Sequence, residues 1–137
     1  MNVDINYLAV FIAAASTMIL GFIWYGPLFG KQWAKMMGMD TKEKMAKVKK
    51  EAPKLYGISF VLALLTAYVL AHVLSFANAH TISDGAQGAF WAWLGFVMPV
   101  QATNAMFNNK SFKLFSIDTG YQLVCFLVMG AILAVWR

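Results

Sequence analysis

Residues 30–54, GKQWAKMMGMDTKEKMAKVKKEAPK, form the stretch that decides the fold. They contain eight lysines and three acidic residues, so their charge, eight minus three, equals the +5 of the whole 137-residue chain. Hydrophobic residues make up 61% of the sequence and charged residues only 12%, against about 25% charged residues in soluble domains. A soluble globule of this size would leave large apolar patches in water. We therefore expect an integral membrane protein.

Four apolar segments surround the basic stretch, at residues 5–25, 55–77, 86–107 and 114–136. A helix over the first of them is about 31 Å long, which matches the roughly 30 Å hydrocarbon core of a bilayer. We predict an all-α fold, an integral membrane four-helix bundle in which residues 1–137 form a single transmembrane domain. Gly26 and Pro27 are expected to end or kink the first helix, and Pro99 to interrupt the third.

Small residues recur at four-residue spacing in several of these segments, which lets neighbouring helices approach closely. The sets are Ala13, Thr17 and Gly21 in the first segment, Ala63, Ala67 and Ala71 in the second, and Gly130 and Ala134 in the fourth. From these stripes we predict a helical module that associates with itself as a homo-oligomer and packs with lipid or partner proteins.

The positions of the lysines predict the orientation in the membrane. Lysines occur only after the first apolar segment and after the third, where Lys110 and Lys113 lie. The positive-inside rule therefore places both connections, including the basic connection 26–54, in the cytoplasm and both termini on the extracytoplasmic side. Only Arg137 does not fit this rule. We expect a multi-pass protein of the cell (inner) membrane.

Within the basic connection we expect either a surface helix or a flexible, solvated loop. Asp40, with Glu43 three residues later, has the spacing of a capping box, and Pro53 is expected to stop such a helix before the second crossing. Nucleic acid is not an expected partner, because the sequence lacks clustered arginines with stacking aromatics beside them. Anionic lipid head groups are expected at Lys42, Lys44, Lys47, Lys49 and Lys50.

Polar side chains within the apolar segments mark the candidate site, because such groups are costly in a membrane. Six of them are expected at a similar depth near the cytoplasmic end: Tyr25, Ser59, Gln101, Asn104, Asp118 and Gln122. One interpretation is a cytoplasm-facing polar pocket for a small solute or a lipid head group. The other is hydrogen bonding between helices that fixes their order, with Asp118 capping the fourth helix or pairing with Lys113.

The sequence contains no catalytic or cofactor motif. His72, His80 and Cys125 lack the spacing of metal ligands, and neither a glycine-rich nucleotide loop nor a nucleophile with a base at motif spacing is present. We therefore predict no enzyme, no metal and no cofactor. Besides the self-associating module, the alternative function is a small-solute transporter or channel that uses the polar pocket.

The two halves of the chain resemble each other. Residues 20–22 (LGF) precede Pro27, and residues 94–96 (LGF) precede Pro99. Such a pattern is expected of a parallel two-helix repeat related by an axis along the membrane normal. Chance similarity between apolar sequences is the alternative explanation.

Residues 24–33, WYGPLFGKQW, and residues 113–121, KLFSIDTGY, resemble the bacterial domain-of-unknown-function 1761 family of small membrane proteins. The resemblance extends over essentially the whole chain. It implies a four-helix membrane protein and carries no established activity. Members of the family often have asparagine at the position of Asp118 and histidine at that of Gln122, so the resemblance does not support a mechanism that requires a carboxylate there.

Overall fold

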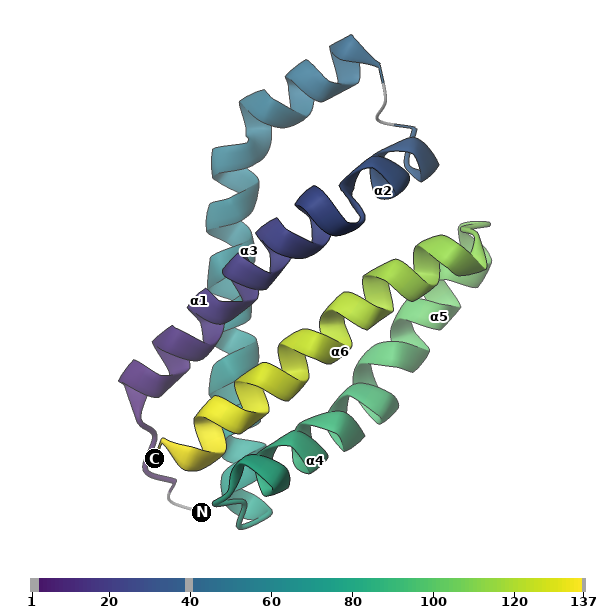
Figure 1. Cartoon of the computed structure of the whole chain (residues 1–137). Helices are drawn as coiled ribbons and strands as arrows, with labels where there is room; N and C mark the ends of the chain where they lie inside the picture. The colour runs from purple at the N-terminus through teal and green to yellow at the C-terminus, as the bar shows by residue number, and fades with distance from the viewer. Residues whose placement is uncertain (1–2, 39–40, 137) are drawn as a thin grey trace.

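The computed structural model describes residues 3–38 and 41–136, and every regular element in these two ranges is a helix (Figure 1). The all-α prediction is therefore confirmed for the described residues. Two π-helical turns extend α-helices: η1 follows α1 directly and is separated from α2 by the non-helical residue Phe29, whereas η2 joins α4 to α5 without a gap. In chain order the elements are α1 (Tyr7–Ile23), η1 (Trp24–Leu28), α2 (Gly30–Met36), α3 (Lys42–Phe76), α4 (Ile82–Ala92), η2 (Trp93–Val97), α5 (Met98–Phe107) and α6 (Phe112–Val135).

Three helical segments are long and apolar enough to cross a membrane: Tyr7–Leu28, Lys42–Phe76 and Phe112–Val135. They cover most of the first, second and fourth segments that we expect to cross. The third expected segment lies in the run from α4 to α5 and is less apolar, because it includes Gln87, Pro99 and Gln101. Length and composition thus indicate membrane association through three helices.

The prediction that Pro53 stops a helix is wrong, because α3 runs without a break from the basic connection into the second apolar segment. Its 35 residues give a length of about 52 Å. Proline removes one helical hydrogen bond and crowds the carbonyl four residues earlier, here that of Lys49. Lys49 and Pro53 are both exposed, so water can solvate the released carbonyl. The lysines of residues 42–54 therefore lie on a helix and not on a flexible loop.

Polar side chains cap the N-termini of the α-helices that start after loops. Asn6 accepts a hydrogen bond from the Ala9 N–H at 3.1 Å, and Ser111 accepts one from the Leu114 N–H at 3.1 Å. The predicted cap Asp40 lies outside the described residues; the side chain that caps α3 is Thr41, which accepts from the Lys44 N–H at 3.4 Å. These caps satisfy backbone donors that the first turn of a helix leaves free.

The closest helix crossing lies between α4 and α6. Gly85 and Ala89 of α4 face Gly130 and Ala134 of α6, so each helix contributes a small residue and a second one four positions later. A Cβ atom on Gly130 would lie 2.6 Å from the Ala89 Cβ and would also overlap the backbone of Gly85. Only glycine permits this approach, which is the packing that small-residue motifs provide in membranes.

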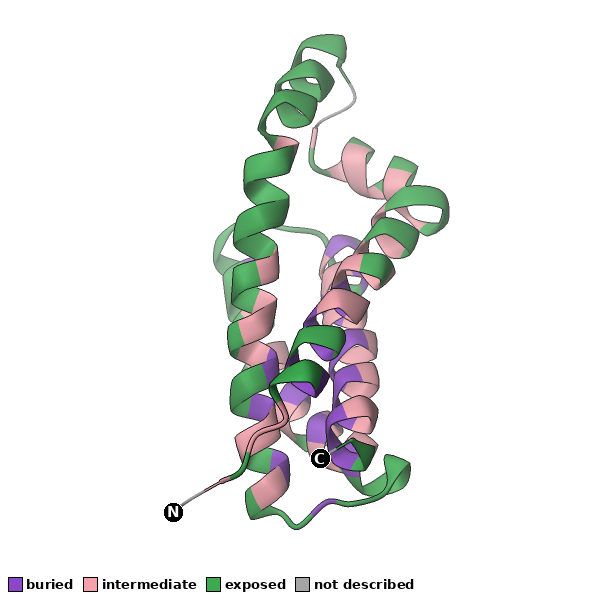
Figure 2. Ribbon diagram, turned by 90° about the vertical axis from the view of Figure 1, so that its left-hand side faces the viewer, coloured by how far each residue is buried: buried purple, intermediate pink, exposed green. Residues whose placement is uncertain are grey.

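The small residues of α1 and α3 are also used within the chain. Ala9 and Ala13 of α1 and Ala67 of α3 are completely buried in the core, together with Leu70 and Leu74. The core therefore lies among α1, the C-terminal half of α3, α4 and α6, and the N-terminal half of α3 stands outside it (Figure 2). We call the apolar stretch of 18 residues within each crossing helix its apolar window. In α6, 44% of this window is buried inside the chain, against 17% in α3.

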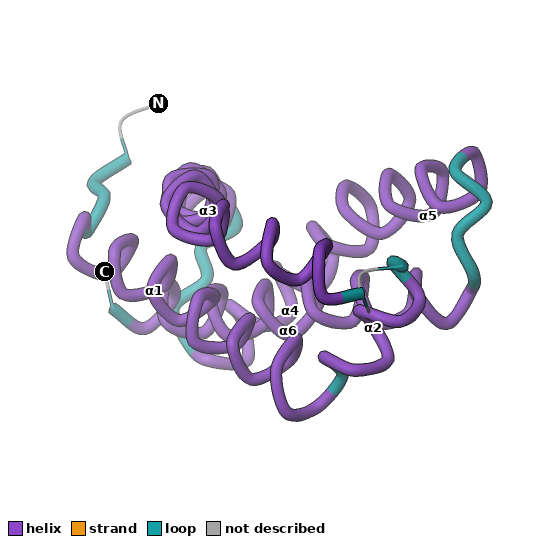
Figure 3. Tube along the Cα trace, turned by 90° about the horizontal axis from the view of Figure 1, so that it is seen from above, coloured by secondary structure: helices purple, strands orange, loops and turns teal. Residues whose placement is uncertain are grey.

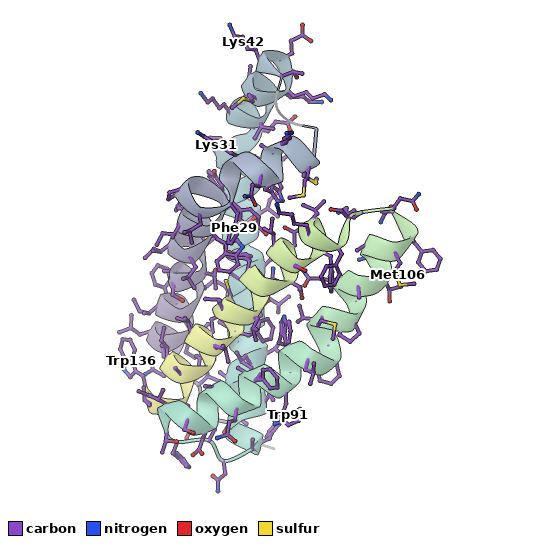
Figure 4. All side chains as sticks on the ribbon, turned by 45° about the vertical axis from the view of Figure 1, so that its right-hand side comes forward. Phe29, Lys31, Lys42, Trp91, Met106 and Trp136 are labelled. Atoms are coloured by element: carbon purple, nitrogen blue, oxygen red, sulfur yellow. The ribbon has the colours of Figure 1, made fainter. Side chains whose placement is uncertain are left out.

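The two ends of the molecule differ in charge. The chain termini lie together at one end, where the Asn6 side chain donates to the Trp136 carbonyl at 3.4 Å (Figure 1). Lys31 and Lys42 lie at the opposite end, far from Trp136 (Figure 4). Viewed from above, the C-terminal part of α3 appears nearly end-on beside α1, and its N-terminal part leans sideways from that axis (Figure 3).

Candidate functional site

Two π-helical turns aim aromatic side chains at α6. In η1 the Phe29 N–H donates to the Trp24 carbonyl, and in η2 the Met98 N–H donates to the Trp93 carbonyl, in both cases five residues back. Pro27 lies inside η1, and Pro99 is the second residue after η2. Because proline cannot donate the normal helical bond, the chain widens by one residue next to it. Both expected helix irregularities are therefore present, and each takes the form of a π-turn.

The first residue of each π-turn is a tryptophan that bonds to the backbone of α6. The Trp24 indole N–H donates to the Ile117 carbonyl at 2.9 Å, and the Trp93 indole N–H donates to the Thr119 carbonyl at 3.1 Å. A carbonyl oxygen has two lone pairs, so it can accept an indole in addition to its helical partner. One turn of α6 is thus held from two sides.

Asp118 lies between these two carbonyls, and its side chain is occupied by Tyr25. The Tyr25 hydroxyl donates to Asp118 Oδ1 at 2.6 Å, so two of the six predicted site residues are in direct contact. Asp118 does not cap α6, since the cap is Ser111. This contact corresponds to the second of the two sequence interpretations, hydrogen bonding between helices.

Tyr121 forms a second link between α6 and α1. Its hydroxyl donates to the Thr17 carbonyl at 2.8 Å. A Cβ atom on Gly21 would lie 3.0 Å from that hydroxyl, so the missing side chain of Gly21 makes room for the phenol. The ring of Tyr121 also contacts Tyr25, with the ring centroids 5.2 Å apart. The predicted stripe on α1 therefore receives an aromatic side chain of α6.

Next to these contacts a cleft of about 250 Å³ lies between α1, α3 and α6, and we call it the polar cleft. Most of the hydroxyls that line it are satisfied within the chain: Thr17 donates to the Ala14 carbonyl at 2.7 Å and Thr66 to the Leu62 carbonyl at 3.0 Å. The polar side chains lining it are Thr17, Ser59, Thr66, Tyr121, Gln122 and the thiol of Cys125.

Ser59 and Gln122 are the exceptions in the polar cleft. Neither the Ser59 hydroxyl nor the Gln122 amide forms a hydrogen bond with another described residue. Polar groups in an apolar surrounding are costly unless they are bonded. Both side chains are therefore available to a ligand or to water, and both belong to the predicted site.

Gln101 and Asn104 do not line the polar cleft, and neither do Tyr25 and Asp118, so two of the six predicted residues, Ser59 and Gln122, lie in it. Asn104 is exposed on α5, in a separate depression that also contains Pro99 and Thr103. Gln101 is half-buried, and its amide oxygen is buried without a hydrogen-bond partner. Residues 101 and 104 share one side of α5, but only part of that side is covered: Ala105 is buried and Gln101 half-buried, whereas Asn104 is exposed.

The basic segment presents its lysines to the surroundings on all sides. Every residue from Thr41 to Glu51 is exposed, including the predicted lipid-facing residues Lys42, Lys44, Lys47, Lys49 and Lys50. Because α3 is continuous, Lys42 lies about 20 Å along the helix axis from Leu55, where the apolar part begins. Only the lysines nearest Leu55 are at the level of lipid head groups if α3 crosses upright.

The turn between α3 and α4 holds the other ionisable groups. Asp84 accepts the His80 N–H at 3.4 Å, and the Asp84 N–H donates to the Thr81 hydroxyl at 3.0 Å. The His80 backbone N–H, followed by the Thr81 hydroxyl, lowers the pKa of Asp84 below its ordinary value. His72 bonds the Tyr68 carbonyl of its own helix at 2.8 Å. Within residues 3–38 and 41–136, no three His, Cys, Asp or Glu side chains come together as a metal site.

Sequence reasoning missed three residues of this region. The sequence patterns indicate Thr17 only as a small packing residue, give no role to Thr66, and do not link Trp93 to the site. A signal for Trp93 is present in the sequence, because Trp24-x-Gly26 and Trp93-x-Gly95 share the pattern W-x-G at the start of the two π-turns.

The sequence matches a family model described as "Protein of unknown function (DUF1761)" over residues 8–134, which is nearly the whole chain. No curated protein and no solved structure matches it. The motifs in residues 24–33 and 113–121 that carry the resemblance are the segments that meet at the Tyr25–Asp118 hydrogen bond. The chain therefore belongs to the DUF1761 family, a family of unknown function.

Proposed function

We propose that the protein crosses the membrane four times, with the lysine end in the cytoplasm and both termini on the other side. The run from α4 to α5 has 26 residues, about 39 Å, and packs along α6, which is itself long and apolar enough to cross. If α6 crosses, this run lies at the same depth. The lysines then lie at the cytoplasmic end, in agreement with the positive-inside rule.

Within this arrangement we propose a ligand-binding function without catalysis. The polar cleft between α1, α3 and α6 takes up a small polar solute or the polar part of a lipid. The observation that carries this proposal is the pair of unbonded side chains, Ser59 and Gln122, in a cleft whose other hydroxyls are bonded within the chain. In this proposal Asp118 holds α1 and α6 together and does not bind the ligand, because its carboxylate already accepts the Tyr25 hydroxyl.

The volume of the polar cleft limits the size of the ligand. At about 250 Å³ it is slightly smaller than the roughly 300–1,000 Å³ of pockets for drug-sized ligands. It therefore fits a small solute or one part of a larger molecule. Transport of that ligand would require a second state open to the other side, for which the two π-turns are suitable hinges.

Binding of glycerol 3-phosphate, a head-group analogue, tests the proposal. We expect Gln122→Leu and Ser59→Ala each to weaken binding about fivefold, because each removes one hydrogen bond to the ligand. The matched controls are Asn104→Leu, outside the polar cleft, and Ser116→Ala, whose hydroxyl bonds its own helix. Equal affinities of the wild type and Gln122→Leu, measured by calorimetry in detergent, would remove the polar cleft as a binding site.

A self-associating module is the second candidate, and α3 favours it. Only 17% of the apolar window of α3 is buried inside the chain, so a second copy could cover the rest. The small-residue stripes no longer support this candidate, because Ala13, Ala67 and Gly130 pack within one chain. Cross-linking of Val61→Cys in lipid distinguishes the two cases: a dimer band at low protein density supports self-association, and monomer alone excludes it at this face.

A further inference from the structure

A second opening adjoins the polar cleft, and we call it the apolar groove. It has a volume of about 420 Å³ and lies between α3, the run from α4 into η2, and α6. Val69 and Val73 of α3 form one wall, and Phe96 and Phe126 contribute to the other. Thr66 lines both openings and is the one polar side chain among the described residues that line the groove. The two openings therefore meet at Thr66.

The chemistry changes in a fixed order along α3. Ser59 lies about 7.5 Å along the axis from Lys54, at a rise of 1.5 Å per residue. Thr66 lies about 10 Å beyond Ser59, and Val73 about 10 Å beyond Thr66. Along the axis of α3 a cation comes first, then unbonded polar groups and finally the apolar groove. Lys54 lies about 140° around the helix from Ser59, so its long side chain has to bend toward the polar cleft to meet a ligand there.

A phospholipid has the same order of chemistry. Its phosphate is anionic, its ester carbonyls accept hydrogen bonds, and its acyl chain is apolar. Each leaflet contributes about 15 Å of hydrocarbon, half of roughly 30 Å, so an acyl chain that starts at Ser59 reaches about as far as Val69, and Val73 lies beyond it. Lys54 can pair with the phosphate, and Ser59 and Gln122 can donate to an ester carbonyl.

We propose that the polar cleft and the apolar groove together hold one anionic phospholipid of the lysine-side leaflet, with an acyl chain between α3 and α6. This proposal rests on the ligand-binding function proposed above and names its ligand class. Charge complementarity selects this occupant: lysines stand at the end of α3 next to the polar cleft, whereas the other end of the groove leads to the lysine-free turn between α3 and α4.

Native mass spectrometry of the full chain, in micelles containing phosphatidylglycerol, tests where the acyl chain lies. Val69→Trp fills the apolar groove and is expected to weaken lipid binding about tenfold. The matched control is Val61→Trp, the same substitution on the same helix at a valine that is 62% exposed and lines neither opening. Equal lipid binding by these two variants would overturn the proposal.

Lipid charge provides the second comparison. We expect phosphatidylglycerol to bind about fivefold more tightly than phosphatidylcholine of the same acyl chains, and Lys54→Gln to remove this preference. Lys42→Gln is the control, because Lys42 lies about 18 Å further from the polar cleft along α3. A preference that is absent in the wild type, or that Lys42→Gln removes as fully as Lys54→Gln, would contradict a phosphate site at Lys54.

The two proposals can fail separately. If Gln122→Leu weakens binding of glycerol 3-phosphate while Val69→Trp leaves phosphatidylglycerol binding unchanged, the polar cleft binds a ligand and the lipid proposal is wrong. If Gln122→Leu affects neither ligand, both proposals are wrong. If Val69→Trp weakens phosphatidylglycerol binding and also abolishes a dimer seen in the wild type, a second copy occupies the groove and the lipid proposal is wrong.

Discussion

At the scale of single residues, the contacts of Tyr25, Trp24 and Trp93 explain why one turn of α6 is central to the structure. Each donates a hydrogen bond to one of three consecutive residues, Ile117 to Thr119. In a membrane, hydrogen bonds between helices contribute about 0.6 kcal/mol each on average, so the three together fix the register of the helices more than they stabilise the fold.

Asp118 is needed as an acceptor, and a charge is not required for that. Asparagine keeps a side-chain oxygen for the Tyr25 hydroxyl, whereas leucine does not. We expect Asp118→Asn to leave the unfolding free energy in detergent nearly unchanged and Asp118→Leu to lower it by about 1 kcal/mol. In the Tyr25→Phe background the loss caused by Asp118→Leu should disappear; a loss that persists in full would show that the hydrogen bond is not its cause.

Gly130 permits the closest contact in the chain, and a single methyl group tests it. Gly130→Ala is expected to lower the unfolding free energy by about 1–3 kcal/mol, because the new Cβ overlaps Ala89 and the backbone of Gly85. Gly57→Ala is the control, since a Cβ there meets nothing within 4 Å; it should be neutral or raise the free energy by about 0.4–1 kcal/mol. Equal effects of the two substitutions on SDS-induced unfolding would contradict the α4–α6 crossing.

At the scale of elements, apolar segment lengths, lysine positions and the helix irregularities at Pro27 and Pro99 could be predicted from the sequence. The sequence predicts a similar depth for Tyr25 and Asp118, because the C-terminal end of α1 and the N-terminal end of α6 both adjoin a connection that contains lysines. The continuity of α3 through Pro53 could not be predicted, since it depends on the exposure of the neighbouring carbonyl. The position of Asn104 could not be predicted either: periodicity shows which residues share a helix face, but not which part of that face the next helix covers.

Among the elements, α3 departs most from expectation, because it is longer than predicted, and spin labels measure its length directly. Labels at Lys44→Cys and Ile58→Cys, in a Cys125→Ala background, should give a narrow distance distribution near 21 Å along the helix axis. A broad distribution, or a clearly shorter distance, would mean that the helix breaks at Pro53. Labels at Ile58→Cys and Ala71→Cys, both within the apolar part, serve as the control for an uninterrupted helix.

The start of α4 depends on pH through Asp84. Its pKa is lowered in the folded chain, so the ionised carboxylate stabilises the fold at pH values above the unfolded pKa of about 3.9. This contribution is lost as the pH falls through the lower, folded pKa. We therefore expect the difference in melting temperature between the wild type and Asp84→Asn to be constant above about pH 5 and to shrink at lower pH. A difference that grows on acidification would contradict this assignment.

At the scale of the whole molecule, one end carries nearly all the net charge and the other carries both termini. The polar cleft and the apolar groove lie between α3 and α6, on the side of the lysines that faces the chain termini. They are open because α3 packs tightly only in its C-terminal half. The proposed orientation and the lipid site both require the lysine end and the termini to lie on opposite sides of one bilayer.

Cysteine labelling on intact cells measures this requirement most directly. In a Cys125→Ala background, Lys47→Cys on α3 and Ser83→Cys at the start of α4 are treated with a membrane-impermeant maleimide before and after permeabilisation. We predict that Ser83→Cys reacts in intact cells and that Lys47→Cys reacts only after permeabilisation. Reaction of Lys47→Cys in intact cells, or of both positions on the same side, would contradict the orientation and with it the cytoplasmic leaflet as the source of the lipid.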